Sequence, residues 1–289
     1  MNNRPLTAQL TTFTASVLFA LMAFCVKLAS AGLSGPEILF IRAMISIVVI
    51  GAVLSFVYKG RVRIRNLNLL VVRAVFGGLA VLFYFIAISR IPLSSAALLA
   101  NSYPLFAVIF SAVLIKERTN LDSLLAVLLA LGGMVLVLEP RFGKLDIGYF
   151  LAIASAVVGG VAVTSIKELR KTDSSWMIAL FQMIGAAVLS LFLTTASFRI
   201  PDAGQWLLLL LIGVLGTGAQ LAFTRPFKAL PTAEGSMVAP LYTAIVMVLS
   251  VLFLGEVLTM RMVSGALLIF GSMIYLIVRE EFNIRRQII

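Results

Sequence analysis

The sequence predicts an all-α integral membrane protein whose ten transmembrane helices form two inverted five-helix repeats. Hydrophobic residues make up 61% of the 289 positions and charged residues 12%. Mean hydropathy is +1.10, far above the range of soluble globular proteins. The second half also repeats the first, because residues 92–138 shifted by 139 positions meet many identical residues. Such pairs include Pro92/Pro231, Ala100/Ala239, Tyr103/Tyr242, Ser111/Ser250 and Glu117/Glu256.

Each repeat is expected to hold five spanning helices, since a helix needs about 20 apolar residues to cross a bilayer. The apolar runs are continuous rather than alternating, so their backbone polar groups are satisfied in lipid by helix formation. Five is an odd number, and the two copies must therefore enter the membrane from opposite sides. We assign residues 1–139 to the first repeat and 140–289 to the second. Inverted repeats are typical of carriers that open one site alternately to each face.

Charged residues, prolines and glycines mark the limits of the expected helices. In order along the chain these helices are 9–30, 36–58, 67–89, 92–115, 120–138, 146–166, 174–197, 204–224, 232–254 and 260–278. Pro104 and Pro240 fall inside the fourth and the ninth, and we expect both helices to be interrupted there. A broken helix near mid-membrane indicates a carrier's binding site, and a simple packing kink is the alternative.

The distribution of basic residues predicts the orientation in the membrane. Fifteen Lys and Arg residues fall in the tails and connections on one side, and five fall on the other. The positive-inside rule then puts both termini in the cytoplasm, with the chain in the cytoplasmic (inner) membrane. The same asymmetry accounts for most of the net charge of +11, so no nucleic-acid partner is needed to explain it. The cluster Lys59–Arg65 is expected to lie against anionic lipid headgroups.

An alternative for the first helix is that it is a signal peptide. Arg4, the apolar run Phe13–Val26 and Ala29-Ser30-Ala31 together imitate one with its cleavage site. Cleavage would remove the repeat partner of the sixth helix, and we therefore expect the first helix to be retained.

The residue inventory leaves little room for catalysis. The chain has no His and one Cys, Cys25, which excludes an internal disulfide, a zinc ligand set and any Ser-His or Cys-His pair. No Walker-type phosphate loop is present either. We expect no catalytic residue, no metal and no cofactor.

Several further short pieces stand out in each half. In the first half they are Arg42, Phe83-Tyr84, Ala87, Pro92-Leu-Ser-Ser-Ala96, Pro104 and Lys116-Glu-Arg118; in the second they are Ala229-Leu-Pro-Thr-Ala233, Pro240, Gly255-Glu256, Gly265 and Gly271. Their order and spacing resemble the EamA-type ten-helix carriers of the drug/metabolite transporter superfamily. The resemblance implies a substrate cavity lined by helices 1, 3, 4, 6, 8 and 9, with helices 5 and 10 at the periphery. Arg73-Ala-Val-Phe-Gly77 also resembles the branch of S-adenosylmethionine and organic-anion carriers.

Polar side chains inside the apolar runs are the candidates for substrate binding, because each costs free energy in lipid unless it is paired or faces a cavity. Arg42 and Gln182 occupy the same position in the two repeats, whereas Arg73 belongs to one copy only. Pairing of Arg42 with Glu37, and an interfacial position for Arg73, are the structural alternatives. The other substrate-binding candidates are Asn101, Tyr103, Gln220, Ser236 and Tyr242. Glu234 is the candidate for proton coupling, or else neutralises a nearby cation.

These features favour a secondary active transporter that moves a small polar organic metabolite, either an amino-acid-like zwitterion or an organic anion. The alternative is a lipid flippase or an intramembrane enzyme, for which the arginines would hold a lipid phosphate. The expected partners are the metabolite and membrane lipid, and the sequence leaves open whether the chain forms a homodimer.

Overall fold

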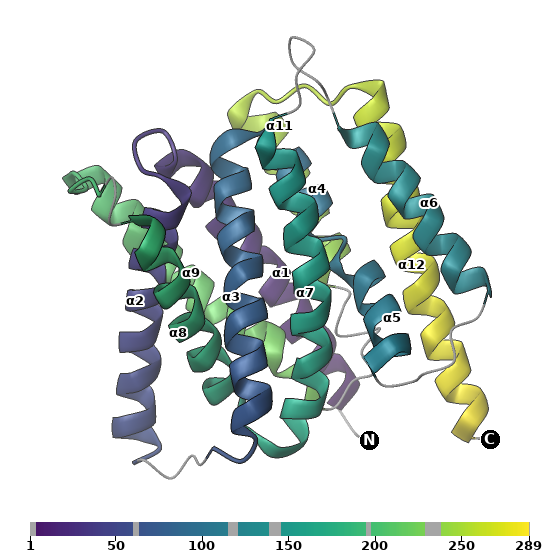
Figure 1. The fold of residues 1–289 in the computed structure, drawn as a ribbon, viewed down its shortest axis with the longest axis horizontal. Helices are drawn as coiled ribbons and strands as arrows, with labels where there is room; N and C mark the ends of the chain where they lie inside the picture. Colours follow the sequence, from purple (N-terminus) through teal and green to yellow (C-terminus); the bar gives the residue numbers. More distant parts are fainter. Residues whose placement is uncertain are drawn as a thin grey trace.

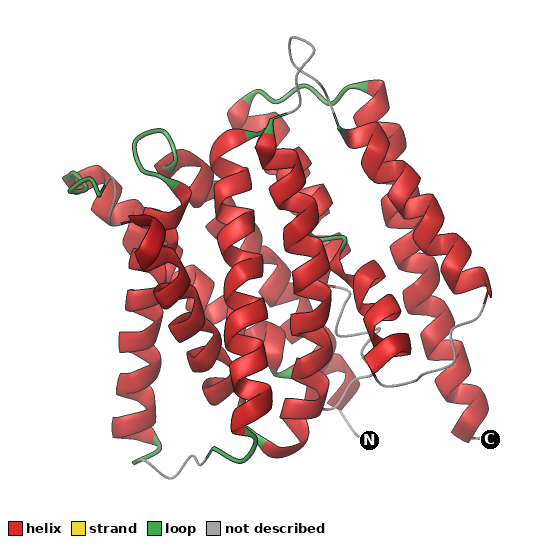
Figure 2. Cartoon of the chain, viewed as in Figure 1, coloured by secondary structure: helices red, strands yellow, loops and turns green. Residues whose placement is uncertain are grey.

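The computed structural model describes residues 4–59, 64–114, 121–138, 146–194, 198–228 and 238–288. Throughout these ranges the regular structure is helical, as Figure 2 shows, and no strand is present in them. Glu117, Glu234 and Ser236 lie outside the described residues. The all-helical class predicted from the sequence is therefore confirmed for the part of the chain that is described.

The helix limits agree with the predicted spans to within a few residues at most ends. In the first half the elements are α1 (Arg4–Ala29), α2 (Gly35–Ala52) with its π-helical end η1 (Val53–Val57), α3 (Leu67–Arg90), α4 (Leu93–Ala100), α5 (Tyr103–Leu114) and α6 (Leu121–Val137). In the second half they are α7 (Ile147–Thr172), α8 (Ser175–Thr194), α9 (Ala203–Thr224), the short 3₁₀ turn η2 (Pro226–Lys228), α11 (Val238–Leu254) and α12 (Met260–Ile288).

Side-chain caps explain where several helices begin. Ser34 and Glu37 form a capping box at the start of α2, and Asp202 and Gln205 form another at the start of α9. In each box the first side chain accepts from a backbone N–H of the first turn, and the second accepts from the N-cap N–H. Two of the donors that a helix start leaves unpaired are satisfied in this way.

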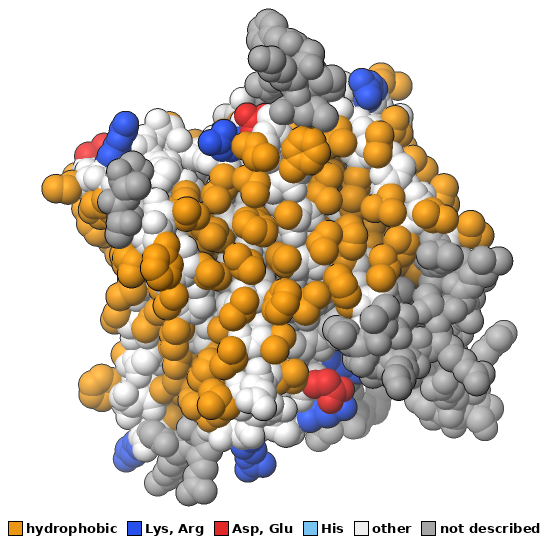
Figure 3. Space-filling view, in the orientation of Figure 1, with side chains coloured by type: hydrophobic (Ala, Val, Ile, Leu, Met, Phe, Trp, Pro, Cys, Tyr) orange, Lys and Arg blue, Asp and Glu red, His pale blue; other side chains and the backbone are white. Residues whose placement is uncertain are grey.

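The surface of the helices is that of a protein surrounded by lipid. By length and composition, six helices of the described residues could cross a membrane: Leu10–Ala29, Gly35–Val57, Leu67–Arg90, Ile147–Thr172, Ser175–Thr194 and Ala203–Thr224. Shorter apolar helices lie at Leu125–Val137, Val238–Leu254 and Met260–Leu276. Figure 3 shows hydrophobic side chains over the middle of this face, with Lys and Arg gathered at its two ends. An apolar surface of this extent is typical of a membrane protein.

The helices of the two halves interleave. α1 packs against α9 and α11, and α3 packs against α7 and α8. In Figure 1, α1 starts at the lower edge of the view and α7 starts at the upper edge, so the two helices run in opposite directions. α6 and α12 pack on each other at the right-hand side of the same view. α1 is an integral part of this core, because Ala20, Ala23 and Val26 are buried in it.

The interruption predicted in the fourth helix is confirmed. The helix is broken, since α4 ends at Ala100 and α5 begins at Tyr103. Pro104 therefore lies in the first turn of α5. Pro240 lies near the start of α11, which continues through Tyr242, and residues 229–237 before it lie outside the described residues, so a break there stays a prediction. Proline is tolerated in a first turn because its missing N–H would have no partner within the helix.

Candidate functional site

A cavity of about 130 Å³ lies where the two halves meet. Its wall is formed by α1, α2, α3, the α4–α5 turn and α5 from the first half, and by α7, α8, α9 and α11 from the second. No described side chain of α6 or α12 lines it. The lining residues are Phe19, Met22, Arg42, Arg73, Gly77, Ala80, Val81, Tyr84, Phe85, Ala100, Asn101, Tyr103, Ser155, Gly159, Ala162, Val163, Gln182, Gln220, Phe223, Val238 and Tyr242.

Arg42 of α2 is the most deeply buried charged group in this wall, with 1% of its surface exposed. Its guanidinium carbon lies 5.3 Å from the centre of the Phe85 ring, a cation–π arrangement. Its Nε and Nη1 have no hydrogen-bond partner among the described residues. A Cβ atom at Gly216 would come within 2.5 Å of the Arg42 Nε. The glycine on α9 therefore makes room for this guanidinium.

Arg73 of α3 is 3% exposed and has one partner in the second half of the chain. Its Nη2 donates to Oε1 of Gln182 on α8 at 2.6 Å, whereas its Nε has no partner among the described residues. Gln182 in turn donates from Nε2 to the carbonyl of Gly77 at 3.5 Å. Because Arg73 is buried against α8, the interfacial alternative for this residue is wrong.

Tyrosine hydroxyls and an amide complete the polar part of the wall. The hydroxyls of Tyr84 on α3 and Tyr242 on α11 are hydrogen-bonded to each other. Asn101, in the turn between α4 and α5, donates to the carbonyl of Ala97 at 2.8 Å and also contacts Tyr242. Tyr103 follows that turn. The interruption of the fourth helix thus brings an amide and a hydroxyl to the cavity.

No carboxylate of the described residues lines the cavity, so its two guanidinium groups carry net positive charge. The predicted alternative partner of Arg42, Glu37, is engaged elsewhere. Its carboxylate accepts from the backbone N–H of Ser34 at 2.7 Å and from that of Arg199 at 2.6 Å. Pairing of Arg42 with Glu37 is therefore wrong, because the capping geometry of α2 holds the carboxylate at the helix end.

Seven of the predicted substrate-binding residues line this one cavity: Arg42, Arg73, Asn101, Tyr103, Gln182, Gln220 and Tyr242. Ser236 and the coupling candidate Glu234 fall outside the described residues. The aromatic side chains Phe19, Tyr84, Phe85 and Phe223 were missed, because an aromatic residue in an apolar run looks the same whether it faces lipid or a cavity.

The repeat register is a signal that could have found some of these residues. A shift of 139 positions takes Tyr84 to Phe223 and Val81 to Gln220, and a shift of 140 takes Phe19 to Gly159. All six residues line the cavity. Equivalent positions of the two halves therefore face the same space, as Tyr103 and Tyr242 also do.

Two charged side chains outside the cavity wall, Glu256 and Lys27, bind backbone groups at helix ends. The Glu256 carboxylate, after α11, accepts from the backbone N–H of Leu93 at 2.6 Å and from that of Ser94 at 3.0 Å, and so caps α4. Lys27 of α1 donates to the carbonyls of Ile88 and Ile91 at 2.8 Å, at the end of α3. Both side chains are bonded to backbone groups that helix ends leave unpaired.

Comparison with known proteins identifies the architecture. The model of the EamA-like transporter family matches this chain twice, over residues 6–139 and 146–278. The chain belongs to the EamA-like transporter family. The two matches together cover α1 to α12 and include every described residue of the cavity wall. Membership in this family, together with the apolar helices, makes the chain a multi-pass membrane transporter.

Relatives of known name are transporters as well. The chain is similar to the pseudopaline exporter CntI of Pseudomonas aeruginosa strain UCBPP-PA14, with 31% identity over 77% of this chain and 78% of that protein. It is also similar to the solute carrier family 35 member G1 of Mus musculus, with 27% identity over 90% of this chain and 75% of that protein. A solved crystal structure shares the fold, with a TM-score of 0.65 and 22% identity over 92% of this chain and 95% of that one.

Proposed function

We propose that this EamA-like transporter is a secondary carrier for a small organic anion or an amino-acid-like zwitterion, which it moves by alternating access. The observation that carries the proposal is Arg42, a fully buried guanidinium with two nitrogen atoms that lack a partner among the described residues. Its position in the cavity wall makes the missing partner a ligand.

The energetic argument rests on the cost of a buried charge. An unpaired charged donor away from water loses about 1–3 kcal/mol or more, and intramembrane ionisable groups are accordingly rare outside functional sites. A carboxylate of the substrate would supply the acceptors that Arg42 lacks, in a planar bidentate arrangement that suits a guanidinium. Arg73 is already bonded to Gln182, and its Nε is available to donate a hydrogen bond to the substrate.

The remaining wall favours a ligand whose body is apolar or aromatic. Phe19, Phe85 and Phe223 offer ring surfaces, and the hydroxyls of Tyr84 and Tyr242 offer one fixed polar contact. A few placed polar groups in a largely apolar wall are the usual composition of a small-molecule site. The charge of the wall also agrees with the resemblance of residues 73–77 to the organic-anion branch of the superfamily.

The alternating-access part of the proposal is supported by how the two halves are arranged. α1 packs against α9 as its repeat partner α7 packs against α3, and equivalent residues of the two halves face one cavity. We infer that residues 1–139 and 140–289 are inverted repeats that rock about this seam. The cavity of about 130 Å³ is smaller than the roughly 300–1,000 Å³ of typical ligand sites. In this proposal the cavity widens to admit substrate.

The relatives support small-molecule transport, since one of them is named for the export of pseudopaline. We place the carrier in the inner membrane with both termini in the cytoplasm, on the basis of the fifteen-to-five distribution of basic residues. Glu234 is proposed as the coupling group. Its replacement by Gln should abolish dependence on a pH gradient and leave exchange intact, and an unchanged pH response would remove it from the mechanism.

The function is tested by uptake into proteoliposomes that contain the purified chain. A panel of organic acids and amino acids, each with its neutral amide analogue, is screened for accumulation without covalent change. We expect an acidic compound to be transported, and Arg73→Ala to weaken its apparent affinity at least tenfold more than that of a neutral analogue. Equal effects on both compounds would remove Arg73 from the site, and lipid scrambling without metabolite uptake would favour a flippase.

A further inference from the structure

A second cavity, of about 440 Å³, lies where α7, α8, α9 and the π-helical end of α2 come together. It is distinct from the central cavity, because the two share no lining residue. Its wall consists of the end of α7, the start of α8 and the residue that follows α9. The lining residues are Tyr58, Arg170, Lys171, Thr172, Asp173, Ser174, Ser175, Trp176 and Arg225.

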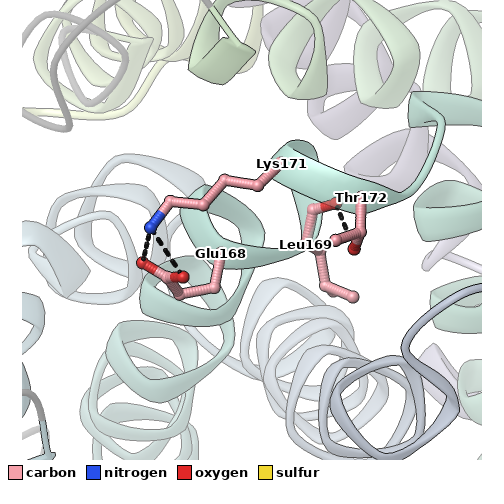
Figure 4. Close-up of polar contacts among 4 residues, drawn as sticks. All are labelled: Glu168, Leu169, Lys171 and Thr172. Atoms are coloured by element: carbon pink, nitrogen blue, oxygen red, sulfur yellow. Dashed lines mark hydrogen bonds and ion pairs between the residues drawn. The ribbon is translucent and has the colours of Figure 1, made fainter.

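Three cations and one carboxylate line this cavity, so its net charge is positive. Lys171 is turned toward Glu168 of the preceding turn, and its Nζ lies 2.7 and 2.8 Å from the two carboxylate oxygens (Figure 4). The Asp173 carboxylate accepts from the backbone N–H of Arg65 at 2.9 Å and from the Thr172 hydroxyl at 2.6 Å. Arg170 and Arg225 are therefore left as the cations available to a ligand.

Arg170 has an unsatisfied donor in this wall. Its Nη1 donates to the carbonyl of Asp173 at 2.9 Å, which fixes the guanidinium against the turn between α7 and α8. Its Nε is buried and has no partner among the described residues. The α8 N-terminus adds the positive end of a helix dipole to the same space. Together these groups form a concave site for an anion with several acceptor oxygens, which describes a phosphate group.

The surroundings show which molecule would carry that phosphate. Directly before Tyr58, the side chains of Phe56 and Val57 are 82% and 69% exposed. The Trp176 indole donates from Nε1 to the Tyr58 hydroxyl at 3.1 Å, and such aromatic pairs are typical of the membrane–water interface. The basic cavity is thus bordered by exposed apolar side chains, which suit the acyl chains of a lipid and would find no partner in a soluble phosphate compound.

We propose that this second cavity binds the phosphate headgroup of an anionic membrane lipid, with Arg170 and Arg225 as ligands and the acyl chains along η1. Basic pockets between helix ends are suited to such headgroups. The bound lipid would link the ends of α2, α7, α8 and α9, helices that also carry Arg42, Gln182 and Gln220 of the central cavity. The site is independent of the transported substrate.

The test uses the full-length chain, purified in detergent and free of added lipid. Phosphatidylglycerol, phosphatidylcholine and soluble glycerol phosphate are titrated separately, and Tm is measured for each, because a ligand that binds the native state raises it. Native mass spectrometry counts the bound lipids. We expect phosphatidylglycerol to raise Tm and the other two to leave it unchanged.

The variants compare basic residues of the second cavity with basic residues on the opposite side of the helices. Arg170→Gln with Arg225→Gln should lose more than half of the Tm shift and the bound phosphatidylglycerol, and Arg225→Gln alone should show part of that loss. Arg90 and Arg261 are exposed cations on the side predicted to hold the five basic residues, and the Arg90→Gln, Arg261→Gln chain should retain the full shift. Equal losses in both double variants would overturn the proposal. An equal shift from glycerol phosphate or phosphatidylcholine would overturn its lipid assignment.

Discussion

Arg42 combines full burial with donors that have no partner among the described residues, an arrangement that costs folding free energy and that the proposed substrate would satisfy. Its neighbours accommodate the guanidinium, since Gly216 leaves room for it and Phe85 offers a ring face. A residue kept only for stability would be better replaced by an apolar side chain of similar length. We therefore expect the polar atoms of this side chain to serve substrate binding rather than packing.

We predict that Arg42→Met leaves the ligand-free protein as stable as the native chain or up to about 3 kcal/mol more stable, because it removes buried donors that lack partners. Transport of the acidic substrate should fall at least tenfold. Thermal unfolding and uptake are measured on the same preparations. A variant that unfolds more easily and transports less in proportion would indicate a structural role for Arg42.

At the scale of single residues, the sequence predicted the polar part of the cavity well. A Gln or Arg in an apolar run stands out because lipid disfavours it, which is why Arg42, Arg73 and Gln182 could be found. Phe85 could not, since aromatic residues are common on lipid-facing surfaces too, and Tyr84 stands out only when it is aligned with Phe223 of the second half. The bonds of Lys27 to the α3 carbonyls depend on a tertiary contact that the sequence does not display.

At the scale of elements, the start of α4 is held by a residue from the other half of the chain. Glu256 accepts from the first backbone N–H groups of α4 and is also bonded to the Ser94 hydroxyl. Because α4 leads directly into the turn that carries Asn101, this cap positions part of the cavity wall. A lost cap leaves helix donors unpaired.

We predict that Glu256→Ala destabilises the protein by about 1–3 kcal/mol, the cost of unsatisfied donors next to a lost charged acceptor. Glu168→Ala is the matched control. It removes a carboxylate from an exposed ion pair with Lys171, worth about 0–1 kcal/mol. Denaturation in mild detergent compares the two variants, and the prediction fails if their losses are equal.

Adjacent glycines of α6 give a test of helix packing. A Cβ atom at Gly133 would lie 2.7 Å from the carbonyl oxygen of Gly265 on α12, whereas one at Gly132 would meet nothing within 4 Å. Gly133→Ala should therefore separate α6 from α12 and lower Tm. Gly132→Ala should raise Tm or leave it unchanged, since Ala favours helix. Similar effects from both substitutions would contradict the close contact.

The ends of the helices were predictable where a capping residue or a proline marks them, and less so elsewhere. α7 extends to Thr172 and α12 to Ile288, beyond the predicted ends at 166 and 278. Their extra turns are rich in Lys, Arg and Glu, which end an apolar run but favour helix. Pro104 marked the interruption between α4 and α5 correctly, because a proline suits the first turn of the helix that follows a break.

At the scale of the whole molecule, most of the fold prediction rested on the duplication of the sequence. It indicated the pairing of α1 with α7 and of α3 with α9 as equivalents, and these helices form the cavity wall in crossed pairs. The substrate could not be predicted, because its identity depends on the shape of a cavity made by side chains from many separate elements of both halves. Those side chains meet only in the folded chain.

The orientation of the two halves is tested most directly by labelling at equivalent positions. Ala31 lies in the turn after α1, and Lys171 lies at the end of α7. Both residues are exposed, and a shift of 140 positions relates them. In a chain with Cys25→Ser, a single cysteine is introduced at either position in intact cells. A membrane-impermeant thiol reagent should label Ala31→Cys from outside and Lys171→Cys only after the membrane is opened. Labelling of both positions from the same side would contradict inverted repeats, and with them the carrier built on their seam.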